Sequence, residues 1–182
     1  MTIIEAVETN NIDFIRKNIG KFDPNQNGQY GFPLLHRACY LGHLEVIEIL
    51  IDSGANIEIV NEYGETALFS VIDDCQDNWF DVIELLIAKG AKVSDDMLAK
   101  AIREEKIQEL IELFIKNGAD VNAYDDIDGG NIINVAYDRG MYDIVEILKK
   151  HGASYDGKIT ENEQMMRDYA LGMLESEKLR KK

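Results

Sequence analysis

A Gly-Ala pair that recurs four times constrains the fold of this chain more than any other feature. Each pair follows a stretch in which apolar residues form two doublets separated by one position, as in Val46-Ile47 and Ile49-Leu50. This spacing predicts an amphipathic helix, and glycine directly after it is typical of a helix that ends in the left-handed conformation. The pairs begin at Gly54, Gly90, Gly118 and Gly152.

A second, shorter helical stretch precedes these helices, for example HRACYLG from His36 to Gly42. A turn that contains glycine comes before it. A unit of turn, helix and helix that repeats about every 33 residues predicts a solenoid, in which each unit covers the apolar face of its neighbour. The turns are Tyr30-Gly31, Tyr63-Gly64 and Asp128-Gly129.

These residues resemble the ankyrin repeat, whose motif runs roughly G-x-T-P-L-H-x-A-A-x-x-G-H-x-x-V-V-x-x-L-L-x-x-G-A-D-V-N. The best copy runs from Gly31 to Ile57, and the phrase GADVN at Gly118–Asn122 is strongly specific. The resemblance covers about residues 1–155. It implies an all-α ankyrin-repeat solenoid, made of helix-turn-helix repeats that carry short β-hairpin fingers.

The expected organisation is an ankyrin-repeat domain over residues 1–155 and a C-terminal capping helix with a basic tail over 156–182. We expect a truncated N-terminal cap repeat at about 1–25, where Thr2 and Glu5 predict a capping box. The full repeats are expected at about 26–58, 59–94, 95–122 and 123–155.

The extra C-terminal helix is predicted from Thr160 and Glu163, which form a second capping box, and from a run of apolar residues. We expect its apolar side to cover the last repeat. A methionine-rich helix that binds a partner is the alternative. The apolar residues are Met165, Met166, Tyr169, Ala170, Met173 and Leu174.

Two repeats depart from the pattern. The repeat at 59–94 carries extra residues between its helices, from Asp73 to Asp81, including the only tryptophan, Trp79. Trp79 either folds over the helix ends or forms an exposed aromatic anchor with an acidic rim. The next repeat lacks a glycine turn, so we expect its hairpin to be missing, with Ser94 or Asp95 capping the helix directly.

The strongly acidic composition bears on the partners. With 34 acidic and 19 basic residues the net charge is −15. This charge repels phosphate backbones and anionic lipid and attracts basic proteins, so nucleic acid and membrane are not expected partners. There is no secretory signal and no long apolar run, and the two cysteines, Cys39 and Cys75, form no CxxC. We therefore expect a cytoplasmic protein.

No residue pattern indicates catalysis, a metal or a cofactor. The nucleotide-binding, zinc-protease and hydrolase motifs are absent. His36 and His43 do not share a helical face because Gly42 breaks the helix between them, and both match structural positions of the ankyrin motif. The loop Ala123–Asn131 has the aspartates of a calcium loop. A twelve-residue calcium loop aligned on them would begin at Tyr124 and end at Val135, and neither residue is a carboxylate, so we expect a hairpin. We predict that the chain is not an enzyme.

The ankyrin resemblance implies that a partner protein binds along the concave side, on the hairpin fingers and the first helices. Two functions remain open: a general adaptor, or an inhibitor such as an immunity protein that covers a basic toxin or nuclease. We expect a monomer in isolation. The candidate partner-binding residues are Tyr30, Phe32, Arg37, Tyr40, Tyr63, Glu65, Asp73, Asp74, Asp126, Asp128, Asp138 and Arg139, with Trp79 as the possible anchor.

Overall fold

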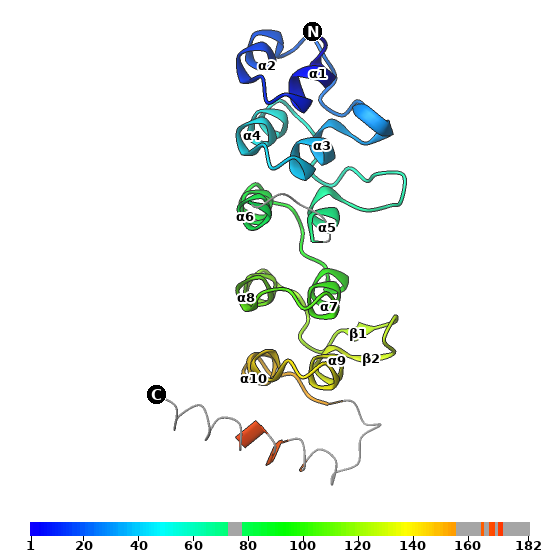
Figure 1. Ribbon diagram of the computed structural model, residues 1–182, viewed down its shortest axis with the longest axis vertical. Coiled ribbons are helices and arrows are strands. Elements are labelled where there is room, and N and C mark those ends of the chain that lie inside the picture. Colours follow the sequence, from blue (N-terminus) through cyan, green and yellow to red (C-terminus); the bar gives the residue numbers. More distant parts are fainter. Residues whose placement is uncertain (73–77, 156–164, 166–167, 170, 173–182) are drawn as a thin grey trace. The chain divides into compact units, whose positions relative to one another are not determined.

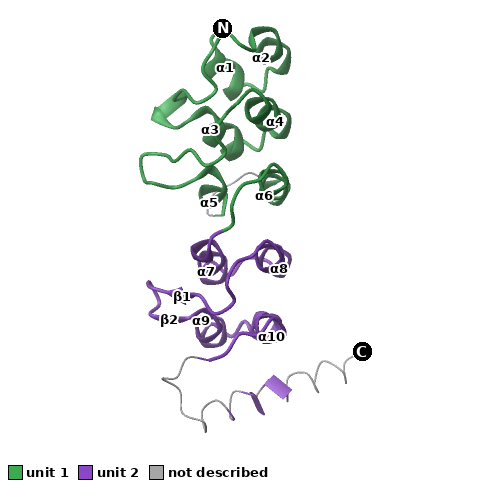
Figure 2. Cartoon of the chain, turned by 180° about the vertical axis from the view of Figure 1, so that it is seen from behind, with its two compact units in different colours: residues 1–93 green, residues 94–182 purple. Residues whose placement is uncertain are grey.

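The computed structural model describes residues 1–72, 78–155, 165, 168–169 and 171–172. Over these residues the regular secondary structure is almost entirely helical, which confirms the predicted all-α solenoid class (Figure 1). Its contacts divide it into two compact units, residues 1–93 and 94–182 (Figure 2). Asp73 and Asp74, the capping box at Thr160 and most of the expected C-terminal helix lie outside the described residues.

Unit 1 is built from three pairs of helices. The first helices of the pairs pack on one another in one row, and the second helices form a parallel row (Figure 1). The first row contains α1 (Ile3–Glu8), α3 (Leu34–Tyr40) and α5 (Ala67–Val71), and the second contains α2 (Ile12–Asn18), α4 (Leu44–Asp52) and α6 (Trp79–Ala88). A 3-10 turn, η1 (Gln29–Gly31), precedes α3.

Unit 2 repeats this arrangement with two pairs of helices. α7 (Asp95–Arg103) packs on α9 (Ile132–Asp138), and α8 (Gln108–Lys116) packs on α10 (Tyr142–Lys150). The hairpin expected before the last pair is present: β1 (Tyr124–Asp125) and β2 (Gly130–Asn131) are antiparallel, with Tyr124 opposite Asn131. No hairpin precedes α7, as the missing glycine turn predicted.

Backbone conformation fixes the turn inside each pair. The residue that joins the two helices has a positive φ in every pair whose connection is a short turn. At Gly42, φ is +67° and an added Cβ would lie 2.1 Å from the Asn78 side-chain oxygen, so a larger residue would be strained and would have to displace Asn78. The other turn residues are Asn10, Glu105 and Gly140, with φ of 52°, 51° and 72°.

Successive repeats are also tied through their loops. A side-chain oxygen in one loop accepts a hydrogen bond from a backbone N–H in the next: Asn25 Oδ1 from Asn56 at 2.7 Å and Glu58 Oε1 from Lys92 at 2.9 Å in unit 1. In unit 2 the acceptors are Asp95 Oδ1, from Asp120 at 2.7 Å, and Asn122 Oδ1, from Ser154 at 3.0 Å. These bonds satisfy loop donors that the helices leave unpaired.

Some local predictions hold and others fail. The Thr2–Glu5 capping box is confirmed. Ser94 takes the N-cap position of α7, but its side chain makes no capping bond, and Asp95 instead binds Asp120. Met165 and Tyr169 are 63% and 66% exposed while Leu171 is buried, so the predicted apolar face is wrong at these two positions.

The longest of the described helices, α6, has 10 residues, whereas a helix needs about 20 to cross the apolar core of a bilayer. None of them combines the length and the apolar character that crossing a membrane requires.

Candidate functional site

Two fingers project from unit 1, one before α3 and one before α5. The first is closed by an antiparallel bridge between Asn27 and Pro33, and the second by a bridge between Val60 and Thr66. Tyr30, at the tip of the first finger, has φ +61°, which is uncommon for a residue other than glycine. Backbone strain of this kind clusters at functional sites, which keeps Tyr30 a candidate binding residue.

Asn61 holds the second finger in shape. Its Oδ1 accepts hydrogen bonds from the backbone N–H groups of Tyr63 and Glu65, at 2.9 and 3.0 Å. Its Nδ2 donates to Glu65 Oε2 at 3.2 Å and to Ser70 Oγ at 3.4 Å. Because Asn61 is buried and all of these bonds stay within the finger and α5, the position of Glu65 is fixed before any partner arrives.

His36, on α3, links this helix to the second finger. It is 5% exposed, and its Nε2 lies 3.0 Å from the backbone oxygen of Glu65. A carbonyl oxygen only accepts, so Nε2 carries the proton and Nδ1 is left as a bare acceptor. Nδ1 is buried and has no hydrogen-bond partner among the described residues. Burial lowers the pKa of His36, despite the opposing effects of the Glu65 backbone and charge, and so keeps the ring neutral.

Arg37 fixes the aromatic side chains of the first finger. Its Nε and Nη2 donate to Glu8 Oε1 and Oε2, at 2.8 and 2.7 Å, in a two-pronged ion pair between α3 and α1. The hydrogen bonds to Glu8 raise the pKa of Arg37. Its guanidinium carbon lies 5.4 Å from the ring centre of Tyr30 and 5.2 Å from that of Tyr40, within cation–π range.

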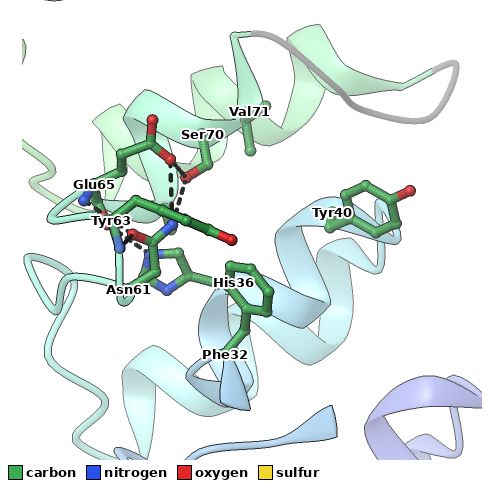
Figure 3. A pocket seen from close by; sticks show the side chains of 9 residues that line it. Phe32, His36, Tyr40, Asn61, Tyr63, Glu65, Ser70 and Val71 are labelled. Atoms are coloured by element: carbon green, nitrogen blue, oxygen red, sulfur yellow. Dashed lines mark hydrogen bonds between the residues drawn. The ribbon is translucent and has the colours of Figure 1, made fainter. Parts of the chain in front are cut away.

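The fingers and the helices behind them enclose a groove. It consists of two hollows of about 210 and 270 Å³, which share Phe32, His36, Tyr40 and Ser70 among their lining residues. The rings of Phe32 and Tyr63 pack at 6.2 Å. They lie on one side of the groove and Tyr40 on the other (Figure 3). Tyr30 and Tyr63 are each 72% exposed.

The finger of unit 2 differs because its charges pair with one another. Asp125 is 2% exposed, and its carboxylate accepts from Arg103 Nη1 at 3.0 and 3.2 Å and from the Ile127 N–H at 2.8 Å. Arg139 donates to Asp128 Oδ2 at 2.8 Å and to the Arg103 backbone oxygen at 2.9 Å. The hydrogen bond to Asp128 raises the pKa of Arg139.

The candidate residues therefore fall into separate groups. The structure brings six of them together around the unit 1 groove: Tyr30, Phe32, Arg37, Tyr40, Tyr63 and Glu65. In unit 2, Asp128 and Arg139 form an ion pair, while Asp126 and Asp138 are exposed. Trp79 is half-buried, begins α6 rather than lying in the preceding loop, and packs edge-on to Phe80 at 5.7 Å.

The candidate set lacks residues that matter to the groove and to the unit 2 finger. Glu8 has no local signal, because its partner Arg37 belongs to the next repeat. Asn61 was detectable in principle, since asparagine commonly bonds backbone groups in turns. Asp125 and Arg103 were not candidates either. No group of three or more His, Cys, Asp or Glu side chains in the described part of the chain is placed to hold a metal ion.

Comparison with known proteins agrees with this architecture. The chain is 25% identical over 163 residues to the potassium channel AKT2/3 of Arabidopsis thaliana, which covers 88% of this chain and 20% of the channel. It is 34% identical over 74 residues to the ankyrin repeat protein FPV014 of fowlpox virus (strain NVSL), which covers 40% of this chain and 17% of that protein. The chain thus spans about a fifth of the length of either relative.

A family model also matches the chain, over about half of its length. The model for ankyrin repeats in three copies matches residues 3–97, which contain all of unit 1 except its first two residues. These residues include both fingers and the whole groove. The chain therefore belongs to the ankyrin-repeat family.

Proposed function

We propose that this chain binds a partner protein through the groove of unit 1 and the fingers that border it. Ankyrin repeats are generally protein–protein interaction modules and are typically not enzymes. The observation that carries the proposal is the pair of tyrosines at the finger tips, Tyr30 and Tyr63, each 72% exposed above a groove with aromatic walls. Tyrosine is enriched among the residues that dominate binding energy at interfaces.

The groove is organised before binding. Arg37 is fixed by Glu8 and lies against the rings of Tyr30 and Tyr40, and Asn61 fixes the turn that carries Tyr63. A partner that docks here orders few additional side chains. Each rotamer-rich side chain that need not be immobilised preserves about 0.5–1.5 kcal/mol of binding free energy.

The proposal extends beyond the groove to the remaining candidates. In unit 2 we propose that Asp126, Asp128, Asp138 and Arg139 contact the same class of partner. The aspartates at 73 and 74 and the half-buried ring of Trp79 are proposed as a secondary contact near α6. Partner binding at these positions rests on their places in the ankyrin motif and on the insertion in the second full repeat.

The test is a comparison of two variants at exposed apolar positions on opposite sides of unit 1. The tagged full chain, the Tyr63→Ala variant and an Ile19→Ser control are each used to capture proteins from the native lysate. Ile19 follows α2, in the row of helices away from the fingers, and is 47% exposed. We expect the wild type and Ile19→Ser to capture the same partner and Tyr63→Ala to lose most of it. Equal capture by all three proteins would refute the groove as the binding surface.

A second candidate function, an inhibitor of a basic enzyme, is favoured by the net charge of −15. An acidic surface steers a basic partner toward it and speeds association. On this proposal the chain acts in the cytoplasm as a monomer, and the captured partner is one basic enzyme that loses activity on binding. Capture of several partners, with their activities intact, would instead support an adaptor.

A further inference from the structure

The hollow between Phe32, Tyr40 and Tyr63 has a chemistry that selects its occupant. Building on the proposed function, we infer that this hollow binds a cationic side chain of the partner, lysine or arginine. The inference rests on the hydrogen-bond inventory of the lining residues, on the aromatic walls and on the charge of the chain.

Apart from the hydroxyls of Tyr40 and Tyr63, which can donate or accept, the polar side chains that line the hollow offer acceptors and no unused donors. Both hydrogens of Asn61 Nδ2 are donated, to Glu65 Oε2 and Ser70 Oγ, and the Ser70 hydroxyl donates to Glu65 Oε2 at 3.2 Å. The Nε2–H of His36 is donated to the backbone oxygen of Glu65. What remains for an occupant is the Glu65 carboxylate, because Nδ1 of His36 has no partner among the described residues but is itself buried. An occupant that only donates, as ammonium and guanidinium do, fits this inventory.

The walls of the hollow also suit a cation. Phe32, Tyr40 and Tyr63 present aromatic rings to it, and a cation placed over such rings gains about 0.5–2 kcal/mol. The volume of about 210 Å³ lies below the ~300 Å³ at which small-molecule pockets begin, so a single side chain matches it better than a free metabolite.

The charges near the hollow also favour a cationic occupant. Glu65 is the acidic residue that lines this hollow. Arg37 lines the adjoining one, but its positive charge is paired with both carboxylate oxygens of Glu8. Over the whole chain the net charge is −15, which draws basic segments toward the surface. A cationic side chain therefore meets the Glu65 carboxylate, which has hydrogen bonds but no ion-pair partner among the described residues, and a favourable field.

The experiment titrates the full chain with four small probes and follows amide and aromatic NMR signals. The probes are N-acetyl-arginine amide, N-acetyl-lysine amide, the uncharged N-acetyl-norleucine amide and the acidic N-acetyl-glutamate amide. We expect the two cationic probes to shift the signals of Phe32, Tyr63 and the His36 ring nitrogens, with arginine and lysine ranked by their affinities. Saturation by norleucine amide at the same concentration, or by the glutamate probe, would overturn the inference.

Two variants in the same finger isolate the effect of the Glu65 charge on the affinity for the cationic probes. Glu65→Gln keeps an amide oxygen that accepts from Asn61 and Ser70 and keeps the backbone oxygen that binds His36. Glu62→Gln removes the same charge from an exposed position that does not line the hollow. We expect Glu65→Gln to weaken the cationic probe about tenfold, as loss of a hydrogen bond to a charged group does, and Glu62→Gln to weaken it less than twofold. Equal effects of the two variants would overturn the inference.

The inference and the proposed function fail in different ways. If Tyr63→Ala abolishes partner capture but Glu65→Gln leaves both capture and probe affinity unchanged, the groove binds the partner and the cationic occupant is wrong. If the cationic probes bind and Tyr63→Ala still captures the partner fully, the hollow takes a cation but is not the partner surface. Circular dichroism of each variant verifies that it folds.

Discussion

The fingers of the two units use their side chains in opposite ways. In unit 1, Arg37 forms an ion pair with Glu8 of α1, outside the fingers. The aromatic rings stay exposed around a groove. In unit 2 the charged residues pair with each other, Asp125 with Arg103 and Asp128 with Arg139. The ion pair between Asp128 and Arg139 weakens the charge that this finger offers to a partner, whereas the rings of Tyr30 and Tyr63 remain 72% exposed. Finger position alone therefore does not identify a binding residue.

The largest expected effect tests whether the unit 2 charges are structural. Asp125→Ala leaves Arg103 without its buried partner, and breaking such a pair costs about 3 kcal/mol. We expect amide protons of α9 to exchange faster by the corresponding factor in hydrogen-exchange measurements. The control is Asp126→Ala, at an exposed neighbour, with an expected change below about 0.5 kcal/mol. Similar exchange in both variants would remove the contrast between the two fingers.

An intermediate effect tests whether Tyr30 is retained for binding at a conformational cost. Tyr30 has φ +61°. In this left-handed region a residue with a Cβ raises the conformational free energy of the folded state by about 1–2 kcal/mol, whereas glycine does not. We expect Tyr30→Gly to be about 1 kcal/mol more stable than Tyr30→Ala, while both variants lose the same share of partner binding. Urea unfolding followed by fluorescence of Trp79, the only tryptophan, measures unit 1. Equal stability of the two variants would show that the finger relaxes and is not strained.

The smallest effect is a pH dependence confined to unit 1. The pKa of His36 is lowered from 6.5 by burial, so the unfolded chain binds its proton more readily than the folded chain does. The stabilising effect of the neutral ring is thus complete above pH 6.5 and is lost as the pH falls through the lower folded value. We expect wild type to lose more stability than His36→Gln between pH 7.5 and 5.5, as monitored by Trp79 fluorescence. Parallel losses in both proteins would exclude a role for the His36 proton.

Much of the fold was predictable because it depends on local pattern. The apolar doublets and the glycines after them located the second helix of every full repeat, and the missing glycine turn before residue 95 predicted the missing hairpin. The Thr2–Glu5 capping box is likewise a local interaction over three residues. The exposure of Met165 and Tyr169 was predicted wrongly, because apolar periodicity marks a helix face without stating what covers it.

The groove itself was only partly predictable. Tyr30, Phe32, Tyr40 and Tyr63 were candidates because the ankyrin motif places fingers and first helices on one side. Glu8 and Asn61 were missed, although they fix Arg37 and Glu65 in place. Their role depends on contacts between repeats or across a turn, which residue spacing within one repeat does not reveal.

The sequence by itself determined the repeat, the helices, the family and the side of each repeat that carries the exposed aromatic residues, because these follow from short-range periodicity and turn chemistry. The tertiary structure alone decided which of the charged and polar candidates are already paired. It buried Asp125 against Arg103, paired Arg139 with Asp128, and bound Nε2 of His36 to the backbone oxygen of Glu65, so that Nδ1 has no partner among the described residues. The physical reason is that pairing depends on distances between residues from different elements, and those distances exist only after the repeats have stacked.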